Sequence, residues 1–144
     1  MTHPGEWQFI GNHKIRVEGD IVNSVWDGPS TLAEIQAYHV VLERVIAERG
    51  RAFTLIDMRK AHRPPPDGRE WITTWSESHE LAAVACFGAS FTVRIFATLL
   101  LRAIRLVKRA GGMMAFFETE AQARAFLAAE RARLDARDTA CSSL

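Results

Sequence analysis

Residues 53–90, FTLIDMRKAHRPPPDGREWITTWSESHELAAVACFGAS, contain one complete strand–helix–strand unit. The apolar run Phe53–Ile56 ends at Asp57, which is typical of a buried strand that reaches the edge of a sheet. Ala82–Phe87 is a second apolar run of strand length, and the residues between the two runs have helical spacing. A strand, a helix and a strand in this order predict a parallel pair joined by a right-handed crossover.

The start of the helix within this unit is marked by proline. Pro64–Pro66 prevent an earlier helix, because proline lacks an amide hydrogen and restricts the residue before it. Asp67 and Glu70 have the spacing of a capping box. We therefore predict Asp67 as the N-cap, which contributes about 1 kcal/mol.

Three strands and a helix are predicted before this unit. The helix begins at the capping box of Thr31 with Glu34 and ends at Gly50. The three strands, which glycine-containing turns separate, are Trp7–Ile10, Lys14–Glu18 and Ile21–Trp26.

A helix, a strand and a final helix are predicted after the unit. Ser90 is the expected N-cap of a helix over Phe91–Ala110. Met113–Phe117 is the last strand, and Thr119 with Gln122 caps the final helix.

The complete pattern predicts an α/β fold in the order β-β-β-α-β-α-β-α-β-α. The economical arrangement is a single mixed β-sheet covered by about four helices. We predict one domain over residues 1–134. The remaining residues, 135–144, are charged and rich in small side chains, so we expect them to form a flexible tail.

Composition sets broad limits on function. The chain has 144 residues, 48% hydrophobic and 24% charged, which argues against global disorder. Two cysteines, Cys86 and Cys141, make no disulfide framework, and the N-terminus lacks the features of a signal peptide. We expect a cytoplasmic protein, peripheral at the inner membrane face if it binds lipid.

The predicted helix Phe91–Ala110 has an unusual distribution of side chains. Its basic residues lie within an arc of roughly 120°, and apolar residues occupy an arc of roughly 200°, wider than an ordinary packed helix needs. No acidic residue occurs between Leu81 and Phe117. Five basic residues belong to this helix, and the rest of the chain has 13 lysines and arginines and 17 acidic residues. The five basic residues are Arg94, Arg102, Arg105, Lys108 and Arg109.

Several interpretations of this helix remain open. It can be an ordinary helix between sheet and solvent whose arginines are merely hydrated. An anionic membrane surface, an apolar small molecule, a homodimer contact or an acidic protein partner would use the same pattern. Nucleic acid is disfavoured, because aromatic residues are not interleaved with the basic ones.

Three landmarks run along the chain in a recognisable order. They are Leu55–Arg59 at a strand end, Val84–Ser90 leading into a helix with Arg94, and Phe116–Leu127 at the close of the fold. In this order and spacing the chain resembles STAS-type domains related to anti-sigma-factor antagonists, in the bacterial branch called SpoIIAA-like. The resemblance covers about residues 7–130 and implies the mixed sheet described above.

The resemblance also bears on function. The SpoIIAA-like branch is similar to CRAL-TRIO lipid-exchange domains, which implies membrane association or binding of an apolar ligand without catalytic residues. Anti-sigma-factor antagonists instead present a phosphorylatable Ser or Thr at the start of the helix that follows the strand ending here at Asp57. In this chain that helix opens with Pro66-Asp67-Gly68. Asp67 is either a permanently charged stand-in for a phosphate or only a helix cap.

Two groups of candidate site residues follow. Trp71 and Trp75 lie one helical turn apart and, besides packing in a core, could line an apolar pocket with Phe91, Phe96 and Leu100. Asp57, Arg59 and Asp67 are candidates for contact with a protein partner at the edge of the sheet. The sequence predicts no catalytic residues, no metal ligands and no cofactor.

The first hypothesis is therefore a non-catalytic STAS-like domain that associates with a membrane surface or an apolar ligand through Phe91–Ala110. The alternative is a regulatory protein-binding module similar to anti-sigma-factor antagonists but without the phosphorylatable Ser or Thr.

Overall fold

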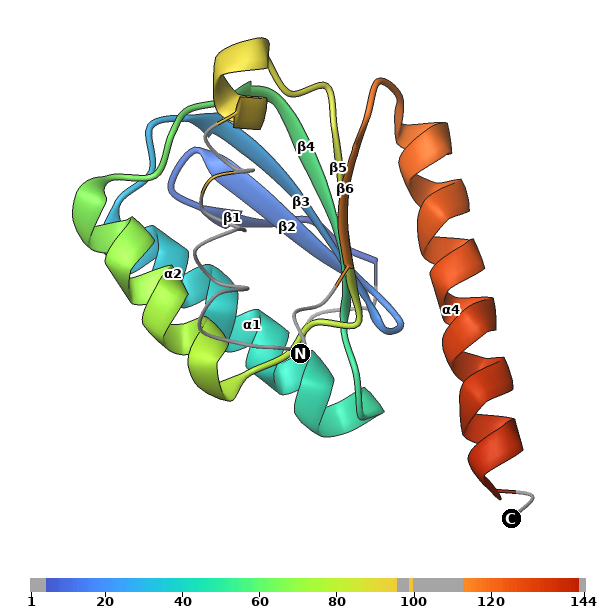
Figure 1. Ribbon diagram of the computed structural model, residues 1–144. Helices are drawn as coiled ribbons and strands as arrows, with labels where there is room; N and C mark the ends of the chain where they lie inside the picture. Colours follow the sequence, from blue (N-terminus) through green and yellow to red (C-terminus); the bar gives the residue numbers. More distant parts are fainter. Residues whose placement is uncertain (1–4, 96–98, 100–112, 143–144) are drawn as a thin grey trace.

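The computed structural model describes residues 5–95, residue 99 and residues 113–142. Within them the chain forms an α/β fold with one six-stranded mixed sheet between helices (Figure 1). The elements in chain order are β1 (Gln8–Ile10), β2 (His13–Glu18), β3 (Ile21–Gly28), α1 (Leu32–Arg49), β4 (Phe53–Ala61), α2 (Pro66–Ser78), β5 (Ala83–Phe87), β6 (Met113–Phe117) and α4 (Glu120–Ser142). Residues 91–95 and 99, between β5 and β6, are also helical. The predicted mixed sheet with about four helices is confirmed.

The strands lie in the sheet in the same order as in the sequence. The pairs β1–β2 and β2–β3 are antiparallel, whereas β3, β4, β5 and β6 are parallel to one another. Successive right-handed crossovers in one direction place their helices on one face of the sheet. α1 and α2 cover that face, and α4 covers the opposite one (Figure 1). The order of the described parallel strands never reverses, so they form no switch-point crevice of the kind in which α/β sheets bind ligands.

The helix α1 begins and ends as the sequence predicts. The Glu34 amide donates to Thr31 Oγ1 at 3.2 Å, and the Thr31 amide donates to Glu34 Oε1 at 2.9 Å, which completes the capping box. Gly50 ends the helix in the left-handed conformation with φ of 81°. The core beneath α1 and α2 contains Ile15, Val22, Tyr38, Leu42, Val45, Ala52 and Trp75.

The helix α2 begins differently from the prediction. It starts at Pro66, its N-cap is Pro65, and no side chain caps its first turn. Asp67 is therefore not the N-cap; its Oδ1 instead accepts the Gly68 amide at 2.8 Å. The reason is that proline suits the first helical position, where its missing amide hydrogen has no partner to lose. Gly68 is needed nearby, since an added Cβ would lie 2.6 Å from Ile35 Cδ1.

The opposite face of the sheet is closed by α4. Thr119 and Gln122 cap this helix as predicted: the Gln122 amide donates to Thr119 Oγ1 at 3.2 Å, and the Thr119 amide donates to Gln122 Oε1 at 3.3 Å. The core under α4 contains Phe53, Leu55, Ala83, Ala85, Phe87, Ala123 and Leu127. Each face of the sheet thus supports its own core.

Several elements are longer than predicted, α4 and β4 most of all. α4 continues through Ser142, so residues 135–142 of the expected flexible tail are helical. Leu134 packs against the core under α4, and Arg51 Nη2 lies 2.8 Å from Asp135 Oδ1, which holds the helix beyond the point where its hydrophobic pattern ends. β4 continues past Asp57 to Ala61, because β3 goes on pairing with it as far as Gly28.

Candidate functional site

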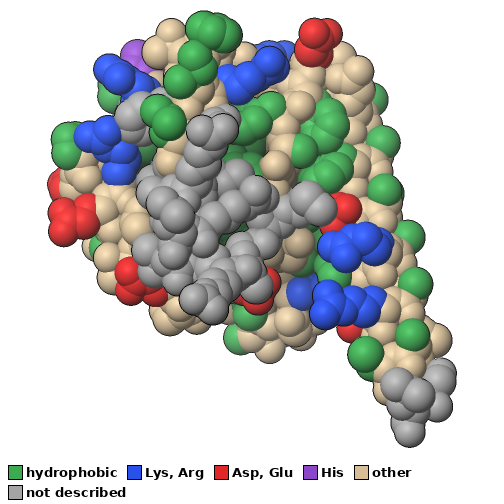
Figure 2. Space-filling view, viewed as in Figure 1, with side chains coloured by type: hydrophobic (Ala, Val, Ile, Leu, Met, Phe, Trp, Pro, Cys, Tyr) green, Lys and Arg blue, Asp and Glu red, His purple; other side chains and the backbone are tan. Residues whose placement is uncertain are grey.

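Exposed apolar side chains follow the helical segment after β5. Phe91 is 77% exposed, Ile95 46% and Leu99 55%. A spacing of four residues places the three on one side of a helix. Figure 2 shows hydrophobic side chains next to Lys and Arg side chains at the top of the molecule, the end at which this segment lies in Figure 1. We call Phe91, Ile95 and Leu99 the apolar stripe.

The first turn of this segment is fixed by Ser90, as the sequence predicts. Ser90 Oγ accepts the Val93 amide at 3.3 Å, and the Ser90 carbonyl accepts the Arg94 amide at 2.8 Å. The Arg94 side chain is exposed beside the apolar stripe. The other predicted residues of this helix, Phe96, Leu100, Arg102, Arg105, Lys108 and Arg109, lie outside the described residues.

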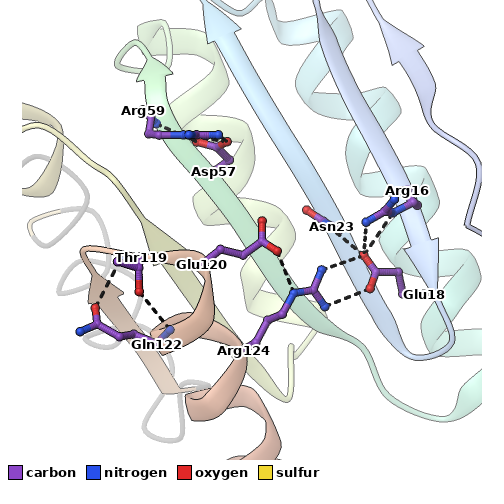
Figure 3. Close-up of polar contacts among 9 residues, drawn as sticks. All are labelled: Arg16, Glu18, Asn23, Asp57, Arg59, Thr119, Glu120, Gln122 and Arg124. Atoms are coloured by element: carbon purple, nitrogen blue, oxygen red, sulfur yellow. Dashed lines mark hydrogen bonds and ion pairs between the residues drawn. The ribbon is translucent and has the colours of Figure 1, made fainter.

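Asp57 and Arg59 form a close ion pair near the end of β4 (Figure 3). Arg59 donates from Nε to Asp57 Oδ1 at 3.0 Å and from Nη2 to Oδ2 at 2.6 Å, and its amide donates to Oδ1 at 3.0 Å. Burial alone would raise the pKa of Asp57, but these hydrogen bonds, the charge of Arg59 and the charge of Lys14 lower it. The Asp57 side chain is 5% exposed and that of Arg59 is 70% exposed.

The turn after β5 packs directly against this ion pair. Gly88 has φ of 73°, and a Cβ at this position would overlap Cγ of Arg59. The Gly88 amide donates to the Phe117 carbonyl at 3.0 Å, which ties the turn to β6. The Arg59 guanidinium also lies 5.8 Å from the centre of the Phe87 ring. The ends of β4 and β5 therefore form one continuous surface.

The structure does not join Asp67 to the other two candidate partner-binding residues. Asp57 follows Phe53 and Leu55 in strand alternation, and these two residues pack under α4. Asp67 belongs to the first turn of α2, which covers the opposite face. Asp57 and Arg59 thus share a site, whereas Asp67 lies apart from it.

Trp71 and Trp75 lie in the core between α1 and α2. Trp75 is 7% exposed and donates from Nε1 to Glu43 Oε1 at 2.8 Å. His39 packs edge-on against both rings, with centroid distances of 4.9 Å to Trp71 and 4.6 Å to Trp75. These contacts account for the two tryptophans as packing residues. Phe91, which was expected to line a pocket with them, is exposed to solvent.

A polar network connects α4 to the strand β2 (Figure 3). Arg124 donates from Nη1 to Glu18 Oε1 at 3.0 Å and from Nη2 to Oε2 at 3.2 Å, and Asn23 Nδ2 donates to Oε2 at 2.8 Å. Burial of Glu18 opposes its ionisation, but the hydrogen bonds from Arg124 and Asn23, together with the charges of Arg124 and Arg16, lower its pKa to about 2. No local sequence pattern indicates this network, because Arg124 and Glu18 are 106 residues apart.

A shallow polar groove of about 600 Å³ lies at the end of the sheet away from Asp57 and Arg59, beside the turn between β2 and β3. Arg51 lies between Asp135 and Asp20 there, and Arg131 pairs with Asp20. These ion pairs hold α4 against the sheet. The groove is lined by Gly19, Asp20, Arg49, Gly50, Arg51, Asp135 and Asp138.

Three further findings concern function. Among the described residues, no group of three or more His, Cys, Asp or Glu side chains is placed to hold a metal ion. Within the same residues, no helix combines the length and the apolar character needed to cross a bilayer. Comparison with protein-family models, curated proteins and solved structures finds no match to this chain.

Proposed function

We propose that this protein is a non-catalytic, STAS-like α/β domain that associates with an anionic membrane surface through the helix beginning at Phe91. The observation that carries the proposal is the apolar stripe. Three large apolar side chains on one side of a helix face water, while the cores on both sides of the sheet are filled by other residues. An exposed apolar row of this kind is typical of an interaction surface.

The charge of the surrounding sequence favours lipid as the partner. Arg94 lies beside the stripe, and the sequence continues with four more basic residues and no acidic one before Glu118. Helices that lie in the membrane interface combine aromatic and aliphatic residues with lysine and arginine in this way. Each basic residue near an anionic leaflet contributes about 1 kcal/mol to binding.

The geometry favours a membrane surface over an enclosed apolar ligand. The apolar pocket considered from the sequence included Trp71 and Trp75, but both pack against His39. The stripe instead faces outward, as a planar partner requires. The STAS-like relationship is part of the proposal and is supported by the element order and by the sequence landmarks.

Co-sedimentation with vesicles tests this function. The protein should sediment with vesicles of phosphatidylcholine and phosphatidylserine mixed three to one, and remain in the supernatant with phosphatidylcholine alone. The variant Phe91→Ser should bind at least about tenfold more weakly, because burying a phenylalanine in an apolar medium contributes about 1.5–3 kcal/mol. Val40→Ser is the matched control, since Val40 is 52% exposed on α1. Equal recovery of the wild type in both supernatants would exclude the proposal.

A further inference from the structure

The ends of two neighbouring strands bring two acid-free segments together. β4 and β5 are adjacent and parallel, and Asp57 of β4 lies in register with Phe87 of β5. β4 continues past this point to Ala61, paired with β3, whereas β5 ends at Phe87, so the segments after Asp57 and after Phe87 begin at the same end of the sheet. Residues 58–66 contain no Asp or Glu, and neither do residues 88–95.

The segment after Asp57 is basic and exposed. It contains Arg59, Lys60 and Arg63, and Lys60 and Arg63 are exposed. Asp57 and Asp67 border this segment in the sequence, and the charge of Glu120, which follows β6, also acts on Arg59. The charge of Asp57 is taken up by the bidentate bond from Arg59. Asp27 of β3 lies in register with Lys60 and marks where the basic surface ends on that side.

Packing between the two segments makes them one surface. Gly88 begins the turn that leads to Phe91, and its α-carbon lies against the side chain of Arg59. The turn is fixed to β6 by the hydrogen bond from the Gly88 amide. The basic segment at the end of β4 and the apolar stripe are thus held at one end of the sheet by the same contact.

We propose that residues 59–63 form a second contact with the membrane, in which Lys60 and Arg63 bind anionic lipid headgroups while the apolar stripe enters the interface. This inference rests on the proposed function and adds the orientation of the domain: the edge formed by the ends of β4 and β5 faces the bilayer. The partner is an anionic membrane because basic and apolar groups lie side by side at one end of the sheet, the combination that inserts into a membrane interface and contacts anionic headgroups at once.

Charge reversal tests the second contact. The variant Lys60→Glu/Arg63→Glu should bind vesicles containing phosphatidylserine at least about tenfold more weakly than wild type, because two cations near the surface are replaced by anions. Arg44→Glu/Arg137→Glu is the matched control: both arginines are exposed, on α1 and α4, and the net charge changes equally. The control should bind within about twofold of wild type.

A fluorescence measurement tests the contact directly and does not depend on charge reversal. An environment-sensitive fluorophore is attached to His62→Cys in a Cys141→Ser background, and its emission should shift to the blue on anionic vesicles. The same fluorophore at Ala136→Cys on α4 should not shift. An unshifted emission at residue 62, or unreduced binding of Lys60→Glu/Arg63→Glu, while Phe91→Ser still weakens binding, would overturn the second contact and leave the proposed function standing. A wild type that binds no anionic vesicle would overturn both.

Discussion

At the scale of single residues, the turn after β5 needs glycine for two independent reasons. Its φ of 73° lies in the left-handed region, which costs a residue with a Cβ about 1–2 kcal/mol. The side chain of Arg59 also occupies the space that a Cβ would need. The same residue therefore determines both the path of the chain toward the apolar stripe and the position of the ion pair with Asp57.

These two effects can be separated by substitution. Gly88→Ala should destabilise the protein by about 2–3 kcal/mol, because backbone strain and overlap with Arg59 add together. Gly19→Ala is the control: Gly19 has φ of 66°, and nothing lies within 4 Å of an added Cβ. Urea unfolding of both variants measures the difference. Equal losses of stability would show that the contact with Arg59 contributes nothing.

At the scale of elements, sequence patterns predicted most of the helices and strands but not all of their ends. The capping box of α1 was predicted correctly, because Thr31 and Glu34 need no tertiary partner to form it. The same pattern failed at Asp67, since Pro66 occupies the first helical position and shifts the helix start. The length of α4 depends on the packing of Leu134 and on the Arg51–Asp135 pair. Both contacts join residues far apart in the sequence, so a local pattern cannot predict them.

In the candidate site, too, local sequence pattern predicted some features and missed others. The helix start at Ser90 was predicted from local pattern, because its capping contact needs no distant partner. The contact between Arg59 and Gly88 could not, because it depends on which strands are neighbours in the sheet. The assignment of Trp71 and Trp75 was ambiguous in the sequence, since a helix face of tryptophans looks the same whether it packs on His39 or lines a pocket.

The polar network between β2 and α4 leads to a prediction about how stability depends on pH. The pKa of Glu18 falls from an ordinary 4.5 to about 2 on folding, so its contribution to stability is fully present above pH 4.5 and disappears as the pH falls toward 2. Glu18→Gln should lower the free energy of unfolding by about 1–2 kcal/mol at pH 6, since the pair is partly exposed to solvent.

Urea unfolding at pH 6 and at pH 2 measures this dependence. The difference between wild type and Glu18→Gln should be present at pH 6 and largely lost at pH 2. Glu48→Gln, at an exposed position of α1, is the control and should match wild type at both pH values. A difference that is the same at both pH values would mean that Glu18 acts through packing and not through its charge.

At the scale of the whole molecule, the two cysteines differ in burial. Cys86 lies in β5, in the middle of the parallel strands, and burial raises the pKa of its thiol to about 12. Cys141 is exposed near the end of α4. The sheet and the helices on its two faces therefore protect one thiol and leave the other open to reagents.

Thiol labelling tests this arrangement. Native protein should react at Cys141 within minutes, whereas Cys86 should react only as fast as the sheet opens, because a buried neutral thiol is a poor nucleophile. Labelling of the variant Cys141→Ser in increasing urea, followed by mass spectrometry, then measures the free energy of opening. Rapid labelling of Cys86 without urea would show that the packing around β5 opens locally.

The agreement between strand order and sequence order also affects how the chain can assemble. Each new strand from β2 onward adds to the edge left by the one before it, so the sheet can grow in step with synthesis from the ribosome. The helix α4 comes last, and among the described elements it alone covers Phe53 and Leu55 on the second face. Until its bond from Arg124 to Glu18 closes across 106 residues, the face of the nascent sheet that carries Phe53 and Leu55 lacks this cover.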